Sequence, residues 1–264
     1  MTLLTDRSAI RARLAADRAW SVYALGDLTP GLFGHTTWHA APDDAALLLL
    51  FRAFGTPVLF TIGSAAGVEG LLDEIQAEPR LFLSIPPDIL PLIRARYAVT
   101  DETPMWRMVL DPARFTTKPT RAVRLSVAHY SALTRLRAGG AAAGAVSASA
   151  EPDFFAPYMV EQGVFYGIFE GDDLVAAAGT HLVAPGEGVA AVGSVYTRPD
   201  RRGRGLATQV TGAVTGELLR LLPSGAIIAL NVMQSNAPAL TVYERLGFSR
   251  HCGFYEGLAE RVRA

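Results

Sequence analysis

The chain has little cysteine, no long apolar run and almost no net charge, and each shortage excludes a class of protein. Cys252 is the only cysteine among 264 residues, which excludes an intramolecular disulfide framework and a cysteine-cluster metal site. No apolar run reaches the roughly 18 residues that a membrane-spanning helix needs. The net charge is −1, so no overall attraction draws the chain toward nucleic acid.

Signals for export and for metal binding are also absent. Charged residues such as Asp6 and Arg7 interrupt the N-terminal stretch where a secretory signal would be apolar. Of the five histidines, only His35 and His39 are four residues apart, and their turn-rich surroundings do not favour a ligand pair. We therefore expect a cytoplasmic, soluble protein without metal, membrane or nucleic-acid partners, and the sequence permits a homodimer.

What is present is a strand, a basic glycine loop and a helix between Ser194 and Thr215. The β-branched and aromatic residues Val195–Thr197 predict a strand, Arg201–Gly205 the loop, and Leu206 the start of the helix. Glycines let a backbone approach its ligand closely, and the first N–H groups of a helix attract an anion. The stretch predicts a phosphate site, although it lacks the lysine of a Walker A loop and the third glycine of a dinucleotide loop.

A second patterned segment, Asn236–Phe248, follows a buried strand predicted over 226–232. Asn236 is suited to cap a helix, and Pro238 is tolerated in the first turn. Gly247 is suited to end the helix before a last strand over 248–255.

Together the two segments resemble one known superfamily. Residues 202–207, Arg-Gly-Arg-Gly-Leu-Ala, are similar to the Gln/Arg-x-x-Gly-x-Gly/Ala signature of the GNAT N-acyltransferases. Residues 236–248 are similar to that superfamily's Asn-x-x-Ala-x-x-x-Tyr-x-x-x-Gly-Phe segment. The resemblance implies an α/β (mixed α+β) fold, in which helices flank a central mixed, mostly antiparallel sheet.

The resemblance also implies site residues and acetyl-CoA as co-substrate. The strand end would bind the thioester and pantetheine, the loop would grip the pyrophosphate, with Arg201 and Arg204 as charge support, and Asn236 would touch the cofactor. Tyr243 would be the general acid that protonates the leaving thiolate. The implied cofactor-binding residues are Val195, Tyr196, Thr197, Arg202, Gly203, Arg204, Gly205, Leu206, Ala207 and Asn236. Two other interpretations stay open: Tyr243 as a core aromatic, and Asn236 as a helix cap alone.

A general base is harder to find. Many relatives carry a glutamate on the strand before the glycine loop, but residues 188–195 contain no carboxylate, and Ser194 could at best order a water molecule. Glu161, His181 and Glu256 are weaker candidates, each of which a surface or structural role explains equally well.

The two halves of the chain show the same expected succession of strands and helices. We therefore predict a degenerate GNAT-like domain over 1–112 and a catalytic domain over 117–264, joined by a proline-bearing connector. Tandem members such as the glycine N-acyltransferase-like proteins resemble this arrangement; an unrelated α+β cap is the alternative. The small-residue segment 138–150 could be a substrate lid or a solvent-exposed loop without function.

The sequence thus favours an enzyme that transfers an acetyl group from acetyl-CoA to a primary amine. The amine would belong to a small molecule, an amino acid or a peptide, attack directly in a ternary complex, and bind near Phe154, Phe155, Tyr158 and Tyr166. The alternative is a non-catalytic acyl-CoA sensor or regulatory scaffold.

Overall fold

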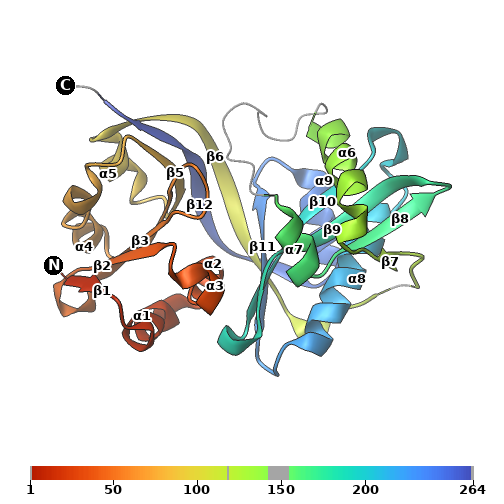
Figure 1. The fold of residues 1–264 in the computed structure, drawn as a ribbon, viewed down its shortest axis with the longest axis horizontal. Coiled ribbons are helices and arrows are strands. Elements are labelled where there is room, and N and C mark those ends of the chain that lie inside the picture. The colour runs from red at the N-terminus through yellow and green to blue at the C-terminus, as the bar shows by residue number, and fades with distance from the viewer. Residues whose placement is uncertain (1, 118, 142–154, 263–264) are drawn as a thin grey trace. The chain divides into compact units, whose positions relative to one another are not determined.

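The computed structural model describes residues 2–117, 119–141 and 155–262. They form two compact units, one of residues 2–106 and 252–262 and one of residues 107–117, 119–141 and 155–251 (Figure 1). The end of the chain therefore packs with the N-terminal residues. The division into domains 1–112 and 117–264 stays a prediction. Most of the segment 138–150, and Phe154, lie outside the described residues.

The elements of the first unit follow in chain order. They are β1 (Thr2–Leu4), α1 (Arg7–Leu14), η1 (Ala15–Asp17), α2 (Val22–Gly26), α3 (Pro30–Phe33), β2 (Thr36–Ala40), η2 (Pro42–Asp44), β3 (Ala46–Phe51), β4 (Val58–Gly63), α4 (Ala65–Glu69), η3 (Leu72–Ile75), β5 (Arg80–Ile85) and α5 (Leu90–Arg94). Two long strands, β6 (Tyr97–Leu110) and β12 (Phe248–Arg261), have residues in both units.

The second unit contains the remaining elements. They are η4 (Pro112–Arg114), β7 (Val123–Arg124), η5 (Val127–His129), α6 (Tyr130–Ala141), α7 (Pro157–Gln162), β8 (Tyr166–Glu170), β9 (Asp173–Ala184), η6 (Pro185–Glu187), β10 (Val189–Thr197), η7 (Pro199–Arg201), α8 (Leu206–Leu221), β11 (Ile227–Met233) and α9 (Ala237–Arg245).

Strand pairing repeats from one unit to the next. In the first unit β1, β2, β3 and β4 pair antiparallel in order, and β4 then pairs parallel with β5. In the second, β7, β8, β9 and β10 do the same, and β10 pairs parallel with β11. A parallel pair needs a crossover connection, here α4 with η3 in one unit and α8 in the other. The mixed, mostly antiparallel sheet predicted from the sequence is confirmed.

The last strand is longer than the one predicted over 248–255. β12 continues to Arg261, and its segment Tyr255–Glu260 lies antiparallel to β5, from Ile85 to Arg80. The C-terminal residues thus complete the sheet of the first unit. Because this pairing joins residues far apart in the sequence, local patterns could not reveal it.

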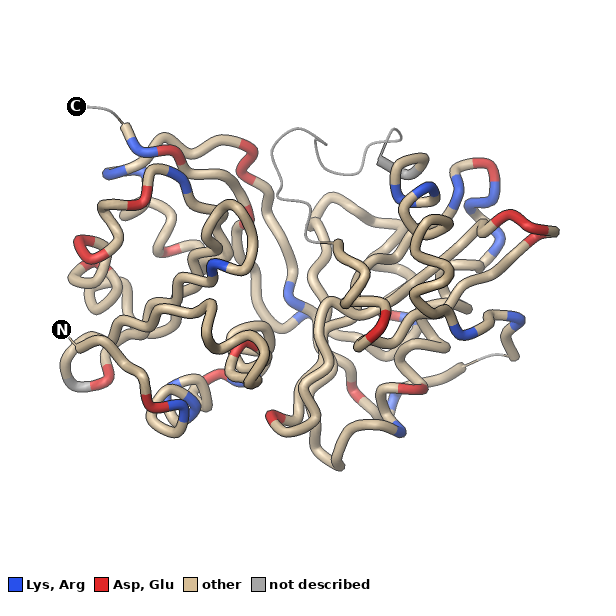
Figure 2. The backbone as a smooth tube through the Cα atoms, in the orientation of Figure 1, with Lys and Arg blue, Asp and Glu red and all other residues tan. Residues whose placement is uncertain are grey.

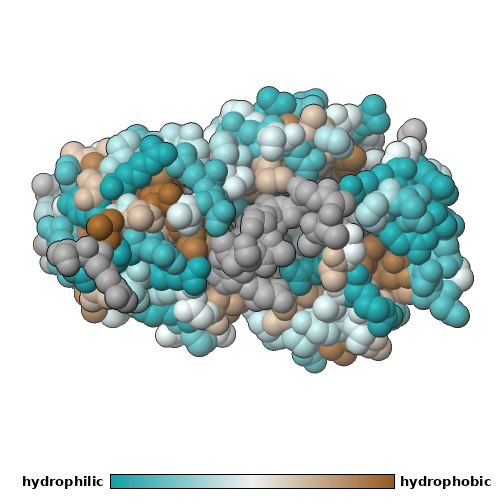
Figure 3. All heavy atoms as spheres, turned by 90° about the horizontal axis from the view of Figure 1, so that it is seen from above, coloured by the Kyte–Doolittle hydropathy of each residue, from teal (hydrophilic) through white to brown (hydrophobic). Residues whose placement is uncertain are grey.

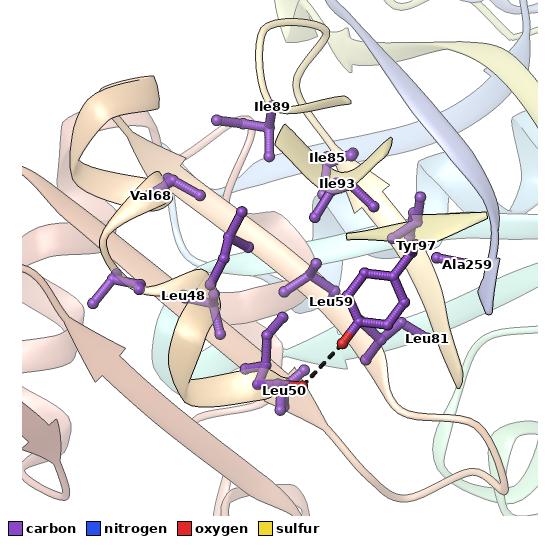
Figure 4. Packing of buried hydrophobic residues seen from close by; sticks show 14 of the residues in the cluster. Leu48, Leu50, Leu59, Val68, Leu81, Ile85, Ile89, Ile93, Tyr97 and Ala259 are labelled. Carbon is purple, nitrogen blue, oxygen red and sulfur yellow. Dashed lines mark hydrogen bonds between the residues drawn. The ribbon is translucent and has the colours of Figure 1, made fainter. Parts of the chain in front are cut away.

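Each unit has its own apolar core. In the first, Leu48, Leu50 and Leu59 of the sheet pack against Val68 and Ile93 of the helices (Figure 4). Tyr97 reaches the same core, where its hydroxyl donates a hydrogen bond to the carbonyl of Ile75 at 3.0 Å. A buried phenol needs such a partner, which explains why this position tolerates a polar atom.

In the second unit, helices lie on opposite faces of the sheet (Figure 1). Leu133 of α6 and Met159 of α7 pack with Phe165 and Ala177 in one apolar cluster. On the other face, the hydroxyl of Tyr166 donates to Glu217 of α8 at 2.5 Å. Successive strand residues point to opposite faces, so Phe165 and Tyr166, which are neighbours, contact different helix layers.

Two local features of the first unit have simple causes. Asp6 caps α1, because its carboxylate accepts the N–H of Ser8 at 2.8 Å. The segment after β4 forms two short helical pieces, α4 and η3. No helix in the described ranges is long and apolar enough to cross a membrane. The face in Figure 3 carries its hydrophobic residues in separate small patches.

Candidate functional site

Strands β10 and β11 pair for only part of their length. The paired residues run from Val189 with Ile227 to Val192 with Leu230, although β10 continues to Thr197 and β11 to Met233. Residues 189–192 are buried, whereas residues 193–197 are half-buried. The backbone of 193–197 on the side of β11 is therefore left without a strand partner and can bind an extended ligand.

A bulge in β10 begins where this pairing ends. Gly193 pairs with Gly179 of β9 and Tyr196 with Ala177, so Ser194 and Val195 together stand opposite Ala178. Ser194 has a φ of 50°, a left-handed conformation that is uncommon for a residue other than glycine. Such a bulge bends its strand, and here it coincides with the end of pairing to β11, while Tyr196 and Thr197 stay paired with β9. Ser194, which the sequence offered only as a water ligand, is thus the bend residue.

The loop after β10 exposes the glycines named from the sequence. Gly203 and Gly205 have φ values of 75° and 73°, and Gly205 is the N-cap of α8. The first backbone hydrogen bond of this helix runs from Gln209 N–H to the Gly205 carbonyl at 3.2 Å. The N–H groups of Leu206 and Ala207 in its first turn therefore remain available to an anion, as helix geometry requires.

Figure 2 colours the positions of basic and acidic residues along the backbone. The basic side chains of this loop differ in how they are paired. Arg201 contacts Glu170 at 2.7 Å and Asp200 at 2.6 Å, and its guanidinium lowers the pKa of Glu170. Arg202 is exposed and donates to the carbonyl of Thr197 at 3.3 Å. Arg204 is exposed and makes no ion pair within the described part of the chain. Arg201 thus holds the loop in place, while Arg202 and Arg204 carry its unneutralised charge.

Helix α9 begins as the sequence predicted. The Asn236 side-chain oxygen accepts the N–H of Ala239 at 3.2 Å, which leaves the amide NH₂ group for another acceptor. Leu240 and Tyr243 lie on the buried side of α9. Tyr243 packs edge-on against Phe248 at a ring distance of 6.2 Å.

The ring of Tyr243 is a core aromatic, but its hydroxyl is not explained by packing. The side chain is 7% exposed, and no described residue forms a hydrogen bond with its hydroxyl. Burial raises the pKa of the Tyr243 phenol, and nearby Tyr196 raises it further. The phenol therefore keeps its proton at neutral pH, and it lies near the strand end that leaves the sheet.

The face of α6 and α7 provides a second set of groups. Arg137 of α6 donates from Nε to the Tyr196 hydroxyl at 3.4 Å, and its guanidinium lies 4.4 Å from the centre of the Phe155 ring. Tyr166 does not join them, because it faces α8. The apolar pocket expected from four aromatic residues is thus wrong in this respect, and Tyr158, 39% exposed, is a surface residue.

The three candidates for the general base lie in different surroundings. Glu161 is exposed on α7. Glu256 pairs with Ser84 in the first unit. His181 is the extra residue of a bulge in β9, between Thr180 and Leu182, and its ring occupies the space beside Gly193. Only His181 shares a strand face with Tyr196.

The first unit has no counterpart of the glycine loop. There Ser64 closes the turn after β4, since its N–H donates to the Ala45 carbonyl at 2.9 Å and its hydroxyl accepts the Gly67 N–H at 3.2 Å. A side chain at Gly63 would come within 2.4 Å of the Ala45 carbonyl oxygen. The turn is therefore filled by its own chain, which fits the prediction of a degenerate half.

The donor set of the second unit fits a nucleotide diphosphate linked to an extended arm. Available N–H groups and two cations suit the phosphates, and the unpaired backbone of 193–197 suits the amides of pantetheine. Tyr243 of α9 lies near Tyr196 of this strand segment, and Asn236 caps the same helix. Among described residues, no three His, Cys, Asp or Glu side chains come together as a metal site.

Known proteins resemble the chain in sequence and in fold. Residues 165–255 match the family model described as FR47-like protein. A mycothiol acetyltransferase from Geodermatophilus obscurus is 38% identical over 91 residues, which cover 33% of this chain and 29% of that protein. A GCN5-related N-acetyltransferase from Kribbella flavida has 18% identity, covers 93% of this chain and 95% of its own, and superimposes with a TM-score of 0.64. Residues 165–255 thus resemble the FR47-like family, and the chain has the fold of GNAT proteins.

The tandem form of the GNAT fold is also present. A tandem GNAT protein from the clavulanic acid biosynthesis pathway has 12% identity, covers 100% of this chain and 98% of its own, and has a TM-score of 0.59. The finer resemblance to glycine N-acyltransferase-like proteins stays a prediction. The matched region covers 29% of the length of the mycothiol acetyltransferase, so the activity in that protein's name is not assigned to this chain.

Arg137 is the site residue that the sequence did not indicate. It lies just before the small-residue segment, and no motif surrounds it. Its neighbours Phe155 and Tyr196 lie 18 and 59 residues further along the chain, so only the fold brings them together.

Proposed function

We propose that the second unit is an acetyl-CoA-dependent N-acetyltransferase that acetylates a primary amine of a small molecule, amino acid or peptide. The observation that carries the proposal is the end of β10–β11 pairing at Val192 and Leu230, a few residues before the glycine loop. The nearness of Tyr243 to Tyr196 of the unpaired strand edge supports taking this edge, the loop and the phenol as parts of one site. Acetyl-CoA carries the corresponding groups, which are a pyrophosphate, a pantetheine arm and a thioester.

The chain's contribution is mainly binding and alignment. The thioester is already an activated acyl group, and holding it against an amine supplies much of the rate. Residues 202–207 would hold the pyrophosphate, and the backbone of Val195, Tyr196 and Thr197 would hold the pantetheine and the thioester carbonyl. Asn236 would add one amide donor.

Tyr243 would act on the leaving sulfur. A phenol whose pKa lies above that of a thiol cannot hand over its proton completely at equilibrium. It can act as a general acid by donating a hydrogen bond that stabilises the developing thiolate while the carbon–sulfur bond breaks. Its lack of another hydrogen-bond partner in the described structure suits this role.

Thermal unfolding with acetyl-CoA, longer acyl-CoAs and free coenzyme A tests the binding step. A ligand that binds only the folded protein must raise the unfolding midpoint. Thiol release with a panel of amines then tests turnover. A raised midpoint with amine-dependent thiol release is expected. No rise at saturating ligand overturns the proposal, and binding without turnover would favour the sensor alternative.

A further inference from the structure

The hairpin that joins β8 to β9 has an acidic residue on each side of its turn. Glu170, the last residue of β8, is the cross-strand partner of Asp173, the first residue of β9. Like charges directly opposite each other in a sheet are destabilising. The hairpin therefore gains stability from cations at this end, and the segment that leads from β10 into the glycine loop supplies them.

Arg198 and Arg201 are these cations. Arg198 binds Asp173 at 3.1 Å, and Arg201 binds Glu170 at 2.7 Å. Asp200 lies between the two arginines, with ion pairs of 2.7 Å to Arg198 and 2.6 Å to Arg201. The five side chains thus form one network of alternating charge, called here the hairpin network, which begins on one strand of the hairpin and ends on the other.

The hairpin network holds the chain at the entrance to the glycine loop. The N–H of Arg198 donates to the Val175 carbonyl at 2.9 Å, and the N–H of Arg201 donates to the Arg198 carbonyl at 2.9 Å, which closes the short turn η7. Beyond it, a Cβ atom at Gly203 or Gly205 would have no neighbour within 4 Å. Packing therefore does not fix the glycine stretch, and its position depends on the ends to which it is attached.

Glu170 is the best anchored carboxylate of the hairpin network. Its side chain is 30% exposed, against 55% for Asp200 and 76% for Asp173. It also contacts a second cation, Arg121, at 3.2 Å. Isolated ion pairs between exposed side chains contribute little, whereas charges joined in a network hold their geometry better. Among the contacts of the loop entrance, the pair of Glu170 with Arg201 is therefore the one to test.

Building on the proposed acetyl-CoA site, we propose that Glu170 is a positioning residue of that site, which acts through Arg201 to hold the glycine loop in the shape that receives the pyrophosphate. The loop is then ordered before the ligand arrives, so binding does not bear the cost of ordering it. A carboxylate near a bound anion is unfavourable by charge alone. Glu170 thus contributes through position and not through attraction.

The sign of the change in affinity separates these two effects. Glu170→Gln removes a negative charge, so by charge alone the anion acetyl-CoA would bind more tightly. Loss of the anchor on Arg201 should instead weaken binding by about threefold in calorimetry, the order expected for one ion pair of a network. The KM for acetyl-CoA should rise to the same extent, while kcat at saturating acetyl-CoA persists.

A matched control removes the same charge from the same hairpin. Asp172 is exposed in the turn and has no ion pair or hydrogen bond within the described part of the chain. Asp172→Asn should therefore bind acetyl-CoA at least as tightly as the unaltered protein. A double variant, Glu170→Gln/Arg201→Gln, tests the route of the effect. If Glu170 acts through Arg201, the double variant should lose no more affinity than Arg201→Gln alone.

Limited trypsin digestion without ligand reports on the loop itself. Cleavage after Arg202 and Arg204, followed by mass spectrometry, should be several-fold faster in Glu170→Gln than in the unaltered protein or Asp172→Asn. Equal or tighter acetyl-CoA binding by Glu170→Gln, additive losses in the double variant, or equal cleavage rates would each overturn the positioning role. Failure of the unaltered protein to bind acetyl-CoA would instead refute the proposed function, and the digestion would still decide whether Glu170 holds the loop.

Discussion

Val192 and Leu230 are the last paired residues of the parallel strands β10 and β11. Both are buried, at 1% exposure each, whereas the next residues of β10 are half-buried. The apolar side chains hold the two strands together up to this pair. One residue later, Gly193 has no side chain to continue the packing, and Ser194 turns the backbone. The pairing of β10 with β11 thus ends where buried apolar side chains give way to Gly193 and Ser194.

The positive φ values of the loop glycines give the first prediction. Alanine at Gly205 adopts φ near 73° only at a cost of about 1–2 kcal/mol, so the loop should relax and lose its cradle. We expect Gly205→Ala to weaken acetyl-CoA binding about tenfold, as measured by calorimetry. Gly186→Ala, at an exposed turn glycine without positive φ or neighbours within 4 Å, should bind as the unaltered protein does. Equal affinities in all three proteins would contradict the phosphate role of the loop.

The second prediction separates two neighbouring arginines. Arg204→Gln should weaken acetyl-CoA binding, and the loss should shrink as salt is raised, because an exposed charge is screened. Arg201→Gln should affect binding less, since Glu170 and Asp200 already neutralise Arg201, but it should loosen the loop. Affinity measured at two salt concentrations distinguishes them. A larger salt-dependent loss in Arg201→Gln would show that this assignment is reversed.

The third prediction concerns Tyr243. Tyr243→Phe keeps the packing on Phe248 and removes a hydroxyl that has no partner among the described residues, so the unfolding midpoint should hardly change. We expect kcat to fall by about 10²-fold or more while acetyl-CoA affinity persists. Because burial raises the pKa of the phenol, ionisation of Tyr243 should not reduce kcat below pH 10. Tyr158→Phe, at a surface tyrosine, is the matched control, and equal kcat in both variants would exclude the acid role.

The fourth prediction concerns stability in the first unit. Burial raises the pKa of Asp27 to about 8, and no described residue forms a hydrogen bond or ion pair with its carboxyl group. Between the unfolded value of 3.8 and about 8, the folded state therefore binds more protons than the unfolded state. Its stability should fall as pH rises through this window, by on the order of 5 kcal/mol in all.

Asp27→Asn removes this titration. The variant should unfold at a higher temperature than the unaltered protein at pH 8, and the difference should narrow toward pH 4. Asp88→Asn, at an exposed carboxylate of the same unit, should follow the unaltered protein throughout. Parallel curves for Asp27→Asn and the unaltered protein would show that Asp27 is ionised in the fold.

Local patterns in the sequence predicted several local features of the candidate site. The glycines and the helix start at Leu206 follow from backbone chemistry, and Asn236 caps α9 as its side chain predicts. The sequence could not show that Arg201 is neutralised whereas Arg204 is not, because a carboxylate that neutralises Arg201 belongs to Glu170 of β8. Nor could it place Tyr166, whose face depends on the register between β8 and β9.

By itself, then, the sequence determined the elements whose causes are local: strand, loop, cap and helix, and through them the superfamily. Only the tertiary structure decided that β12 completes the first unit, that Ser194 bends β10, and that His181 and Arg137 share one face of the sheet. The physical reason is that strand pairing, bulge position and burial depend on contacts between residues far apart along the chain, which no local pattern encodes.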